Sequence, residues 1–442
     1  MLSLVIAGEL VFGLAFNIPR FFRPTMLDVF GFTNTQLGDM FAVYGVAAML
    51  AYFPGGALAD KFSARTLIVL SLLSTSLGGA YMATIPGTTG MQILYGYWGL
   101  TTIFLFWGAL IRATRDWGGN KSQGVAFGVL EGGRGLVAAV AALVGVNVLA
   151  FYMPENARLA TADERELGLQ MIILLYSLLT FFAAVFVWFV IPQEKRGSDV
   201  EFNPFTGMGI VLRRPIIWAQ AAIIVCAYCC FKGLDNYSLY AVQVLGKDEV
   251  EGARLAAYGV WTRPVAAILT GLIADRFNAT RSIAVMFGIL GISYLSWFAA
   301  SPSGAGMAVI YANFFTTYVA VYALRGIYFA LMEENRIPKF LTGAAVGLIS
   351  LVGYTPDIFF GPISGRILDA NPGQVGFQNY FIFLASIAAV GLLIVIWLIW
   401  LRRHGGKKLW QDVEEGKFNI QRAGSALDEV RSDAHDVLRS LD

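Results

Sequence analysis

The sequence predicts an all-α membrane protein with twelve transmembrane helices in two pseudo-symmetric six-helix bundles. Composition is the first reason, because 57% of the 442 residues are hydrophobic and only 14% are charged, whereas soluble domains carry about 25% charged residues. The second is a series of apolar runs near the length of about 20 residues that crosses a bilayer. The third is an internal repeat at about half the chain length. Together they exclude a cytosolic enzyme, a secreted disulfide scaffold and a nucleic-acid-binding module.

Twelve apolar runs are bounded by charged residues, glycine or proline. Their expected spans are 2–28, 36–58, 66–86, 90–112, 123–152, 168–192, 215–244, 253–274, 282–300, 305–332, 341–366 and 377–401. Several exceed the bilayer thickness and therefore require tilt or kinks. The first run has no basic n-region and no small-residue cleavage site, so it is expected to be a retained span and not a signal peptide.

Lysine and arginine in the short loops predict the orientation of the spans. Every second loop is basic, with residues such as Lys61, Arg65, Arg213 and Arg214, whereas the opposite loops are mixed or acidic. This places both termini in the cytoplasm. The expected domains are an N-terminal bundle (1–192), a cytoplasmic linker (193–214), a C-terminal bundle (215–404) and a polar cytoplasmic tail (405–442). The tail is expected to be a solvated helix or disordered, with a docking element as the alternative.

The internal repeat relates one loop in each half of the chain. Gly56, Asp60 and Lys61 recur as Gly271, Asp275 and Arg276 at an offset of 215 residues (271 − 56), close to half of 442. Two weaker echoes pair Gly124 with Gly343 and Arg20 with Lys232. Parallel repeats related by an axis along the membrane normal are a known architecture of membrane transporters, and this architecture is the template for the two expected bundles.

The repeated loop resembles the signature of the major facilitator superfamily. The matching residues are Gly56, Asp60, Lys61 and Arg65 in the first copy and Gly271, Asp275, Arg276 and Arg281 in the second. Ser63 and Asn278 stand where the family usually has glycine, and Arg281 lies one residue late. The resemblance implies that Asp60, Lys61, Arg65, Asp275 and Arg276 form a conformational latch between the halves. Ordinary topology-setting charge is the alternative.

Ionisable residues inside the spans are the candidates for function, because each costs roughly 2.5–3.5 kcal/mol on insertion scales. They are Glu9, Arg20, Arg23, Glu131, Arg134, Lys232, Asp235, Arg263 and Asp357. Arg112 and Arg325 occupy equivalent places near the ends of two spans and are expected to snorkel to the interface. Whether Arg23 faces a cavity is left open by the sequence.

Arg20 and Lys232 are expected to form a cationic clamp for an anion, because equivalent positions approach the pseudo-symmetry axis from opposite sides. Arg20 follows Pro19 and Lys232 precedes Gly233, so each lies where a helix can bend. The pair resembles the organophosphate-antiporter branch of the superfamily, in which basic residues of the first and seventh helices bind phosphate. Lysine replaces the second arginine of that branch, and lysine is a point charge without the planar fork of arginine. A carboxylate or a sulfonate ligand therefore remains an alternative to phosphate.

Other residues complete the expected site. Arg263 lies near mid-membrane and is expected to be buried against a carboxylate or the substrate, and Glu131 and Arg134 are spaced to pair on one helix face. Asp357, Asp235 and Glu131 are candidates for proton coupling or for structural salt bridges, and Asp357 follows Pro356, where a break in the eleventh span is expected. The substrate-binding candidates are Arg20, Lys232, Arg263, Arg134, Tyr44, Asn236, Tyr240 and Trp261.

No cofactor, metal or catalytic set is expected. Cys226, Cys229 and Cys230 lie in an apolar run without a nearby histidine, which favours packing over a metal or redox role. His404 and His435 lie at or beyond the last span. No Gly-rich phosphate loop is present, so ATP hydrolysis is not indicated.

The predicted function is secondary active transport of a small organic anion, of sugar phosphate, sulfonate or carboxylate type, by antiport or proton symport. The expected partners are this anion, protons or phosphate as counter-ion, and the lipid of a bacterial inner membrane, with the protein as a monomer and no nucleic acid. A proton-coupled exporter of apolar or cationic compounds, and a transporter-like receptor that binds without moving its ligand, are the alternatives.

Overall fold

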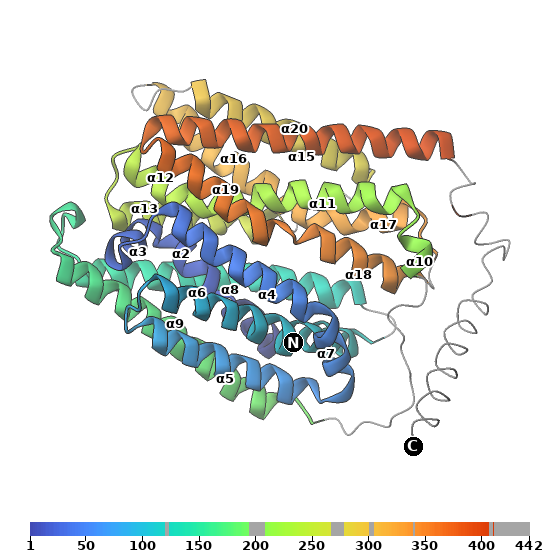
Figure 1. Ribbon diagram of the computed structural model, residues 1–442, viewed down its shortest axis with the longest axis horizontal. Helices are drawn as coiled ribbons and strands as arrows, with labels where there is room; N and C mark the ends of the chain where they lie inside the picture. Colours follow the sequence, from blue (N-terminus) through green and yellow to red (C-terminus); the bar gives the residue numbers. More distant parts are fainter. Residues whose placement is uncertain are drawn as a thin grey trace, which may run out of the picture.

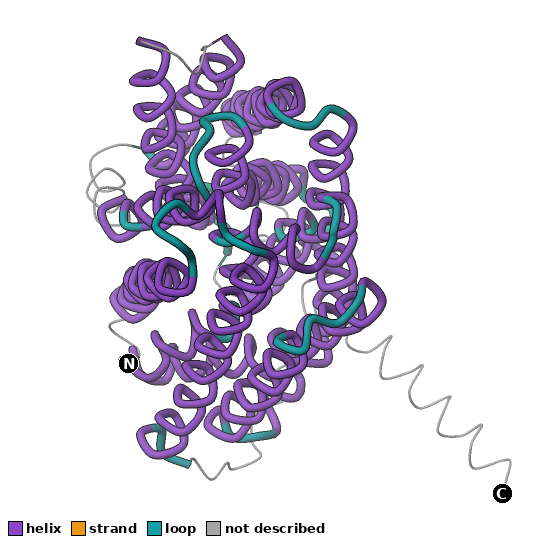
Figure 2. The backbone as a smooth tube through the Cα atoms, turned by 90° about the vertical axis from the view of Figure 1, so that its left-hand side faces the viewer, coloured by secondary structure: helices purple, strands orange, loops and turns teal. Residues whose placement is uncertain are grey.

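The computed structural model describes residues 1–119, 123–193, 208–266, 278–299, 305–338, 341–405 and 410. Within these residues the secondary structure is helical, and Figure 2 shows the helices joined by short loops. The latch candidates Asp275 and Arg276 and the side chain of Asp60 lie outside the described part of the chain.

The N-terminal half contains the first six expected spans. Its elements are α1 (Leu2–Leu10), a π-helix (Gly13–Asn17), α2 (Ile18–Phe21), α3 (Arg23–Phe30), α4 (Asn34–Lys61), α5 (Ala64–Met82), α6 (Thr88–Gly99), a second π-helix (Leu100–Trp107), α7 (Gly108–Gly118), α8 (Gln123–Tyr152), a 3₁₀ turn (Ala157–Leu159) and α9 (Ala162–Val190). Elements α1 to α3 form one interrupted span, and α6 and α7 form another.

The C-terminal half repeats this order. Its elements are α10 (Met208–Val211), α11 (Pro215–Gly233), a 3₁₀ turn (Leu234–Asn236), α12 (Tyr237–Gln243), α13 (Glu249–Val260), α15 (Ala279–Ala299), α16 (Ala305–Ile327), a 3₁₀ turn (Tyr328–Ala330), α17 (Leu331–Glu334), α18 (Thr342–Gly353), α19 (Pro356–Ala370) and α20 (Gln374–Gly405). In Figure 1 this half forms the upper layer of helices and the N-terminal half the lower layer.

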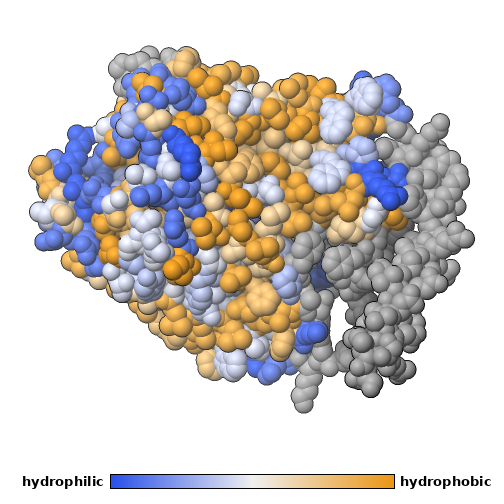
Figure 3. Space-filling model, in the orientation of Figure 1, coloured by the Kyte–Doolittle hydropathy of each residue, from blue (hydrophilic) through white to orange (hydrophobic). Residues whose placement is uncertain are grey.

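The described helices fit a membrane protein. Eight are long and apolar enough to cross a bilayer, or nine if the bent pair Leu2–Leu10 and Gly13–Phe21 is one span. Each of the twelve expected spans coincides, in its described part, with one helix or an interrupted series. Apolar residues cover the middle of the face shown in Figure 3, and polar residues gather at one end. The predicted all-α fold class is confirmed.

Three helix interruptions lie where the sequence predicts bends. The first span bends at Phe22 (φ −110°, ψ 27°), two residues after Arg20. Helix α11 ends at Gly233, directly after Lys232, and α19 begins at Pro356 directly before Asp357. Proline cannot donate a backbone hydrogen bond to the preceding turn. The breaks therefore place charged side chains beside irregular backbone in the middle of the spans.

Helix α9 begins six residues earlier than expected (168 − 162), which corrects the predicted boundary. Thr161 and Glu164 form a capping box, in which each side chain accepts a hydrogen bond from the other residue's backbone N–H. This arrangement satisfies N–H groups that otherwise lack an intrahelical partner. Hydrophobicity alone places the start at the first apolar run and misses the polar first turn.

Two long helix pairs form most of the seam between the halves, and the short helices α2 and α3 also contact α12 and α13. Helix α4 packs along α19, and α8 packs against α13. The first crossing is very close, because a Cβ on Gly38 would lie 2.2 Å from the carbonyl oxygen of Gly361. A Cβ on Gly365 would similarly lie 2.4 Å from the carbonyl oxygen of Asn34. Only glycine lets the two backbones approach this far.

The two ends of the molecule differ in how they are held together. We call the end with residues 28–39, 153–165, 243–251 and 366–374 the sealed end, and the opposite end, which carries Lys61, Arg65 and Arg402, the basic end. The basic end lies at the right of Figure 1, where α20 ends and α10 lies.

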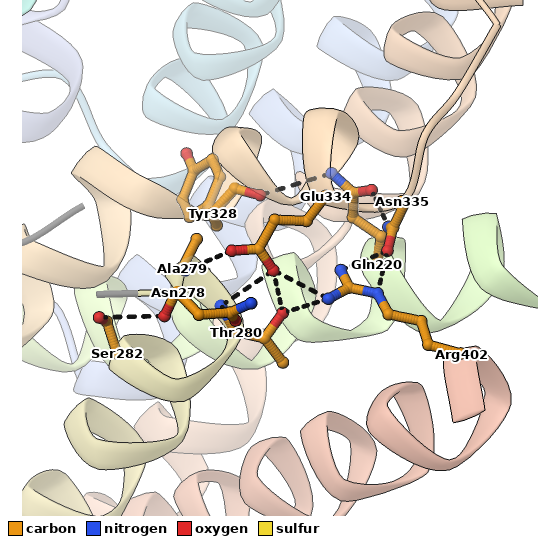
Figure 4. A network of polar contacts seen from close by, with 9 residues as sticks. All are labelled: Gln220, Asn278, Ala279, Thr280, Ser282, Tyr328, Glu334, Asn335 and Arg402. Carbon is orange, nitrogen blue, oxygen red and sulfur yellow. Dashed lines mark hydrogen bonds and ion pairs between the residues drawn. The ribbon is translucent and has the colours of Figure 1, made fainter. Parts of the chain in front are cut away.

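A closed polar network ties together four helices of the C-terminal half at the basic end (Figure 4). Arg402 donates to Asn335 (2.8 Å), Glu334 (2.8 Å) and Thr280 (2.7 Å), and Asn335 donates to Gln220 (2.8 Å). These residues belong to or directly follow α11, α15, α17 and α20. Trp410 is buried and donates to the carbonyl oxygen of Asn335 at 3.0 Å, so it extends the same network.

Candidate functional site

A buried cluster of four charged residues lies in the middle of the bundle, and we call it the central charge cluster. Its members are Arg20, Lys232, Asp235 and Asp357. Asp235 accepts from Arg20 at 2.6 Å and pairs with Lys232 at 3.2 Å, so one carboxylate joins both cations of the predicted clamp. Asp357 pairs with Lys232 at 3.5 Å and accepts from the Tyr228 hydroxyl at 3.1 Å. The cluster carries no net formal charge.

Around the central charge cluster, aromatic rings of each half contact a cation of the other half. The ammonium of Lys232 lies 4.4 Å from the ring centre of Phe16 and 4.5 Å from that of Phe41, both in the N-terminal half. The guanidinium of Arg20 lies 4.5 Å from the ring centre of Phe231 in the C-terminal half. Each cation thus contacts rings of the opposite half, which adds cation–π attraction to the ion pairs.

A second charged group lies between the central charge cluster and the basic end, and we call it the arginine layer. Its members are Glu9, Glu131, Arg134, Arg263 and Arg325. Arg134 pairs with Glu131 at 2.6 Å, as the spacing predicts, and with Glu9 at 3.4 Å. Arg263 reaches the same two carboxylates from the other half, at 3.2 Å and 3.4 Å. Its side chain crosses Gly135, where a Cβ would lie 2.9 Å from the Arg263 Cγ.

Arg325 differs from the other cations of the arginine layer. Its guanidinium lies 3.9 Å from the ring centre of Phe231 and 5.8 Å from that of Tyr228. Among the described residues it makes no hydrogen bond or ion pair, although Glu131 lies near enough for electrostatic attraction. Its equivalent Arg112 donates to the carbonyl oxygen of Ala59 at 2.6 Å. The repeat pattern predicts interface anchoring for both arginines and so misses the difference.

The remaining expected substrate contacts lie in different surroundings. Tyr44 is buried beside Phe16 and shares a 2.7 Å hydrogen bond with Thr102. Asn236 is buried in the break of the seventh span and donates to Tyr380 at 3.0 Å. Tyr240 stacks on Trp297 in the core of the C-terminal half. Trp261 directly follows α13 and is 39% exposed.

Arg23 and the described latch residues contact their own half. Arg23 is buried at the sealed end and donates to Asn34 at 3.1 Å. Arg65 donates to Gln193 at 2.6 Å and lies 4.6 Å from the ring centre of Trp188. Lys61 is exposed. The latch at the basic end therefore stays a prediction.

Polar contacts between the halves occur at the sealed end and in the middle of the bundle. Glu249 of α13 accepts from Thr25 (2.9 Å) and from Arg165 (2.8 Å). Asp369 of α19 accepts from the backbone N–H groups of Asn34 (3.1 Å) and Thr35 (2.7 Å). In the middle of the bundle, Arg20 donates to Asp235 and Arg263 donates to Glu9, and at the sealed end Arg366 donates to Asp39. The sealed end is thus closed in this conformation.

An open hollow of about 480 Å³ crosses the seam at the sealed end. Both halves line it, with Asp28, Asn34 and Arg165 on one side and Glu249 and Asp369 on the other. Sequence reasoning missed these pairings, because the partners are far apart in the chain. The only signal for them is the mixed charge in the loops opposite the basic ones.

Replacing Glu249 by glutamine is expected to weaken closure of the sealed end. The variant keeps an oxygen acceptor but loses the negative charge that strengthens two hydrogen bonds between the halves, and an effect of about 1 kcal/mol changes a conformational equilibrium about fivefold. Spin labels at the exposed positions Asp163 and Gln374, in a background without the native cysteines, measure the distance between the halves. Glu251→Gln is the matched control, because the Glu251 carboxylate binds Lys247 and Asp248 of its own half. Identical distance distributions for both variants would contradict the expectation.

Two parallel helical bundles that enclose buried charges along their seam define a secondary membrane transporter. The chain belongs to the Major Facilitator Superfamily, whose family model matches residues 5–359. This family and the folds described below indicate a transporter and not an enzyme.

Two relatives from Escherichia coli K12 cover most of the chain. The inner membrane protein YqcE is 29% identical over 404 residues, which are 88% of this chain and 91% of that protein. The inner membrane protein YihN is 26% identical and covers 90% of this chain and 94% of its own. A probable nitrate/nitrite antiporter from Thermus thermophilus, NarK1, is 25% identical over 65% of this chain and 62% of its own length. This chain is a multi-pass membrane protein.

Solved transporter structures share the fold at low sequence identity. A bacterial homologue of the human lysosomal transporter Spinster, in an inward-facing and occupied conformation, has a TM-score of 0.69 at 15% identity and covers 90% of this chain and 95% of its own. The nucleoside transporter NupG has a TM-score of 0.68 at 12% identity, with 90% of this chain and 98% of its own covered. These similarities establish the fold.

Proposed function

We propose that the protein moves a small organic anion across the bacterial inner membrane by alternating access. The supporting observation is the charge inside the bundle, away from both ends. Five cations (Arg20, Arg134, Lys232, Arg263 and Arg325) lie there with four acids (Glu9, Glu131, Asp235 and Asp357). A surplus of positive charge in a low-dielectric region is costly and favours an anionic ligand. A carrier of cations would instead need a surplus of negative charge in this region.

The central charge cluster fits a role in the conformational change. Arg20 belongs to one half and Asp235 to the other, and their 2.6 Å ion pair is buried. Rotation of the halves toward opening at the sealed end separates this pair and leaves Arg20 and Lys232 free for an anion. Asp235 then acts as an internal counter-ion in the empty transporter, because a buried cation without a partner is strongly unfavourable.

Coupling to protons is proposed for the carboxylates of the seam. Asp357 has the longest ion pair of the central charge cluster (3.5 Å) and a tyrosine hydroxyl as its second partner. Asp235 is held by two cations, and Glu131 is half exposed between two arginines. Asp357 is therefore the first candidate to gain and lose a proton, with Asp235 and Glu131 next. We place the basic end and both termini in the cytoplasm, so that the sealed end faces the periplasm and this conformation is closed toward the periplasm.

The proposal is tested with purified protein in liposomes. A thermal-shift screen with sugar phosphates, glycerol phosphates, sulfonates, dicarboxylates and sugar acids first identifies a ligand, because a ligand stabilises the state that it binds. Counterflow of the labelled ligand is then expected in the wild type and absent in Arg20→Ala and Lys232→Ala. Lys247→Ala, in which the altered cation lies outside the seam and pairs within its own half, is the control. Wild-type rates in both seam variants would refute the clamp, and binding without counterflow would favour a receptor.

A further inference from the structure

Arg325 is the cation of the seam whose charge is not offset by a contact between described residues. Arg20 and Lys232 pair with Asp235, and Arg134 and Arg263 pair with Glu131. Arg325 instead rests on aromatic rings and is partly exposed. Because a guanidinium stacked on a ring keeps its N–H donors directed away from the ring face, the hydrogen-bonding fork of Arg325 is left for a ligand.

The charges of the arginine layer determine how much negative charge a ligand should bring. Three arginines (Arg134, Arg263 and Arg325) carry +3, and Glu9 with Glu131 carries −2, which leaves a surplus of +1. One negative charge neutralises the layer. A second would leave a net negative charge in the middle of the bundle, which is as costly as the surplus that it replaces.

Aromatic side chains define the surroundings of Arg325. Tyr228 lies edge-on to Tyr354, with ring centres 5.0 Å apart, and Phe231 lies 5.7 Å from Tyr228. All three rings are partly exposed. Because Arg325 and Arg20 both stack on Phe231, a ligand at the guanidinium has the rings of Tyr228 and Tyr354 as its apolar neighbours, which favours a body with at least one apolar face.

We propose that Arg325 binds the charged group of the transported substrate in this conformation, in which Asp235 occupies Arg20 and Lys232, and that this substrate is a monoanion with one carboxylate or sulfonate group. The carboxylate or sulfonate oxygens accept hydrogen bonds from the N–H donors of the Arg325 guanidinium, and the apolar face of the substrate packs against Tyr228 and Tyr354. Phosphate monoesters carry about −1.5 to −2 at pH 7 and bring too much charge. The inference rests on the proposed anion transport and departs from the organophosphate resemblance in its charge and in its anchoring residue.

The test compares four anions on the full-length, detergent-solubilised protein. D-gluconate and isethionate are monoanions, with a carboxylate and a sulfonate, and succinate and sn-glycerol 3-phosphate carry more charge. One or both monoanions are expected to raise the melting temperature of the wild type at concentrations where the other two do not. Arg325→Gln should need at least tenfold more of the same monoanion for an equal shift. Arg115→Gln, an exposed change of equal charge at the basic end, should behave as the wild type.

The outcomes separate the two proposals. If none of the four anions shifts the wild type, the single-charge assignment fails, whereas the proposed anion transport fails only when the wider screen also finds no anionic ligand. If a monoanion shifts the wild type and Arg325→Gln equally, Arg325 is not the anchor, whereas the proposed function stands. A preference for succinate or glycerol phosphate overturns the single-charge assignment. Should Arg325→Gln not fold, Arg325→Lys keeps the charge without the planar fork and is expected to weaken binding measurably; unchanged binding overturns the proposal.

Discussion

Gly38→Ala is expected to hold the sealed end apart and to reduce transport to a few per cent of the wild-type rate. The added Cβ would lie 2.2 Å from the carbonyl oxygen of Gly361 and 2.4 Å from its carbonyl carbon. Both atoms belong to the backbone, so no side-chain rotation relieves the overlap and α4 must move away from α19. A transporter that closes this end poorly cannot complete its cycle. The measurement is counterflow in liposomes together with the distance between spin labels at Asp163 and Gln374.

The control for this variant lies in the same span as Gly361. A Cβ on Gly347 of α18 meets no atom within 4 Å, so Gly347→Ala should transport at the wild-type rate and keep the wild-type label distance. Wild-type distances and rates in Gly38→Ala would show that the α4–α19 crossing is looser than its geometry indicates. If the variant opens at the sealed end yet transports at the wild-type rate, transport does not require closure at this crossing.

Asp235→Ala is expected to be the most destabilising single change in the seam. It leaves Arg20 and Lys232, which are 6% and 2% exposed, without their shared carboxylate. Removing one partner of a buried ion pair costs about 3–5 kcal/mol. For a chain of this size we expect a fall in melting temperature on the order of 10 °C in detergent, with loss of transport.

Two comparisons make the Asp235 experiment specific. Asp116→Asn removes a carboxylate from an exposed pair with Arg112 at 3.6 Å, and exposed pairs contribute about 0–1 kcal/mol, so its melting temperature should stay close to that of the wild type. Combining Asp235→Asn with Lys232→Met restores the charge balance and should recover part of the stability lost in Asp235→Asn alone. Equal melting temperatures for Asp235→Ala and Asp116→Asn would contradict burial of the central charge cluster.

The sequence predicted the fold better than it predicted the site, and the reason is physical. Span positions depend on local composition, so the twelve spans and the breaks at Gly233 and Pro356 agree with the helices. The pairing of Glu131 with Arg134 is also local, since it depends on helical spacing. The sharing of Asp235 between Arg20 and Lys232 depends on how the halves meet, which residue order does not specify.

Pseudo-symmetry was informative for the backbone and misleading for some side chains. It predicts that Arg20 and Lys232 lie close together, and in the structure the carboxylate of Asp235 bridges them. It also suggested equal roles for Arg112 and Arg325, although the first binds a backbone carbonyl and the second rests on rings. Equivalent positions in a repeat share their backbone geometry, whereas their partners come from neighbouring segments that have diverged.

The network at the basic end has a mechanical consequence for the C-terminal half. Arg402, Asn335 and their partners fasten four helices to one another across their tips (Figure 4). These hydrogen bonds hold the four helix ends at fixed distances from one another. When the halves rotate, the four ends are therefore expected to move as one unit at the basic end, whereas the sealed end opens by separating contacts between the halves.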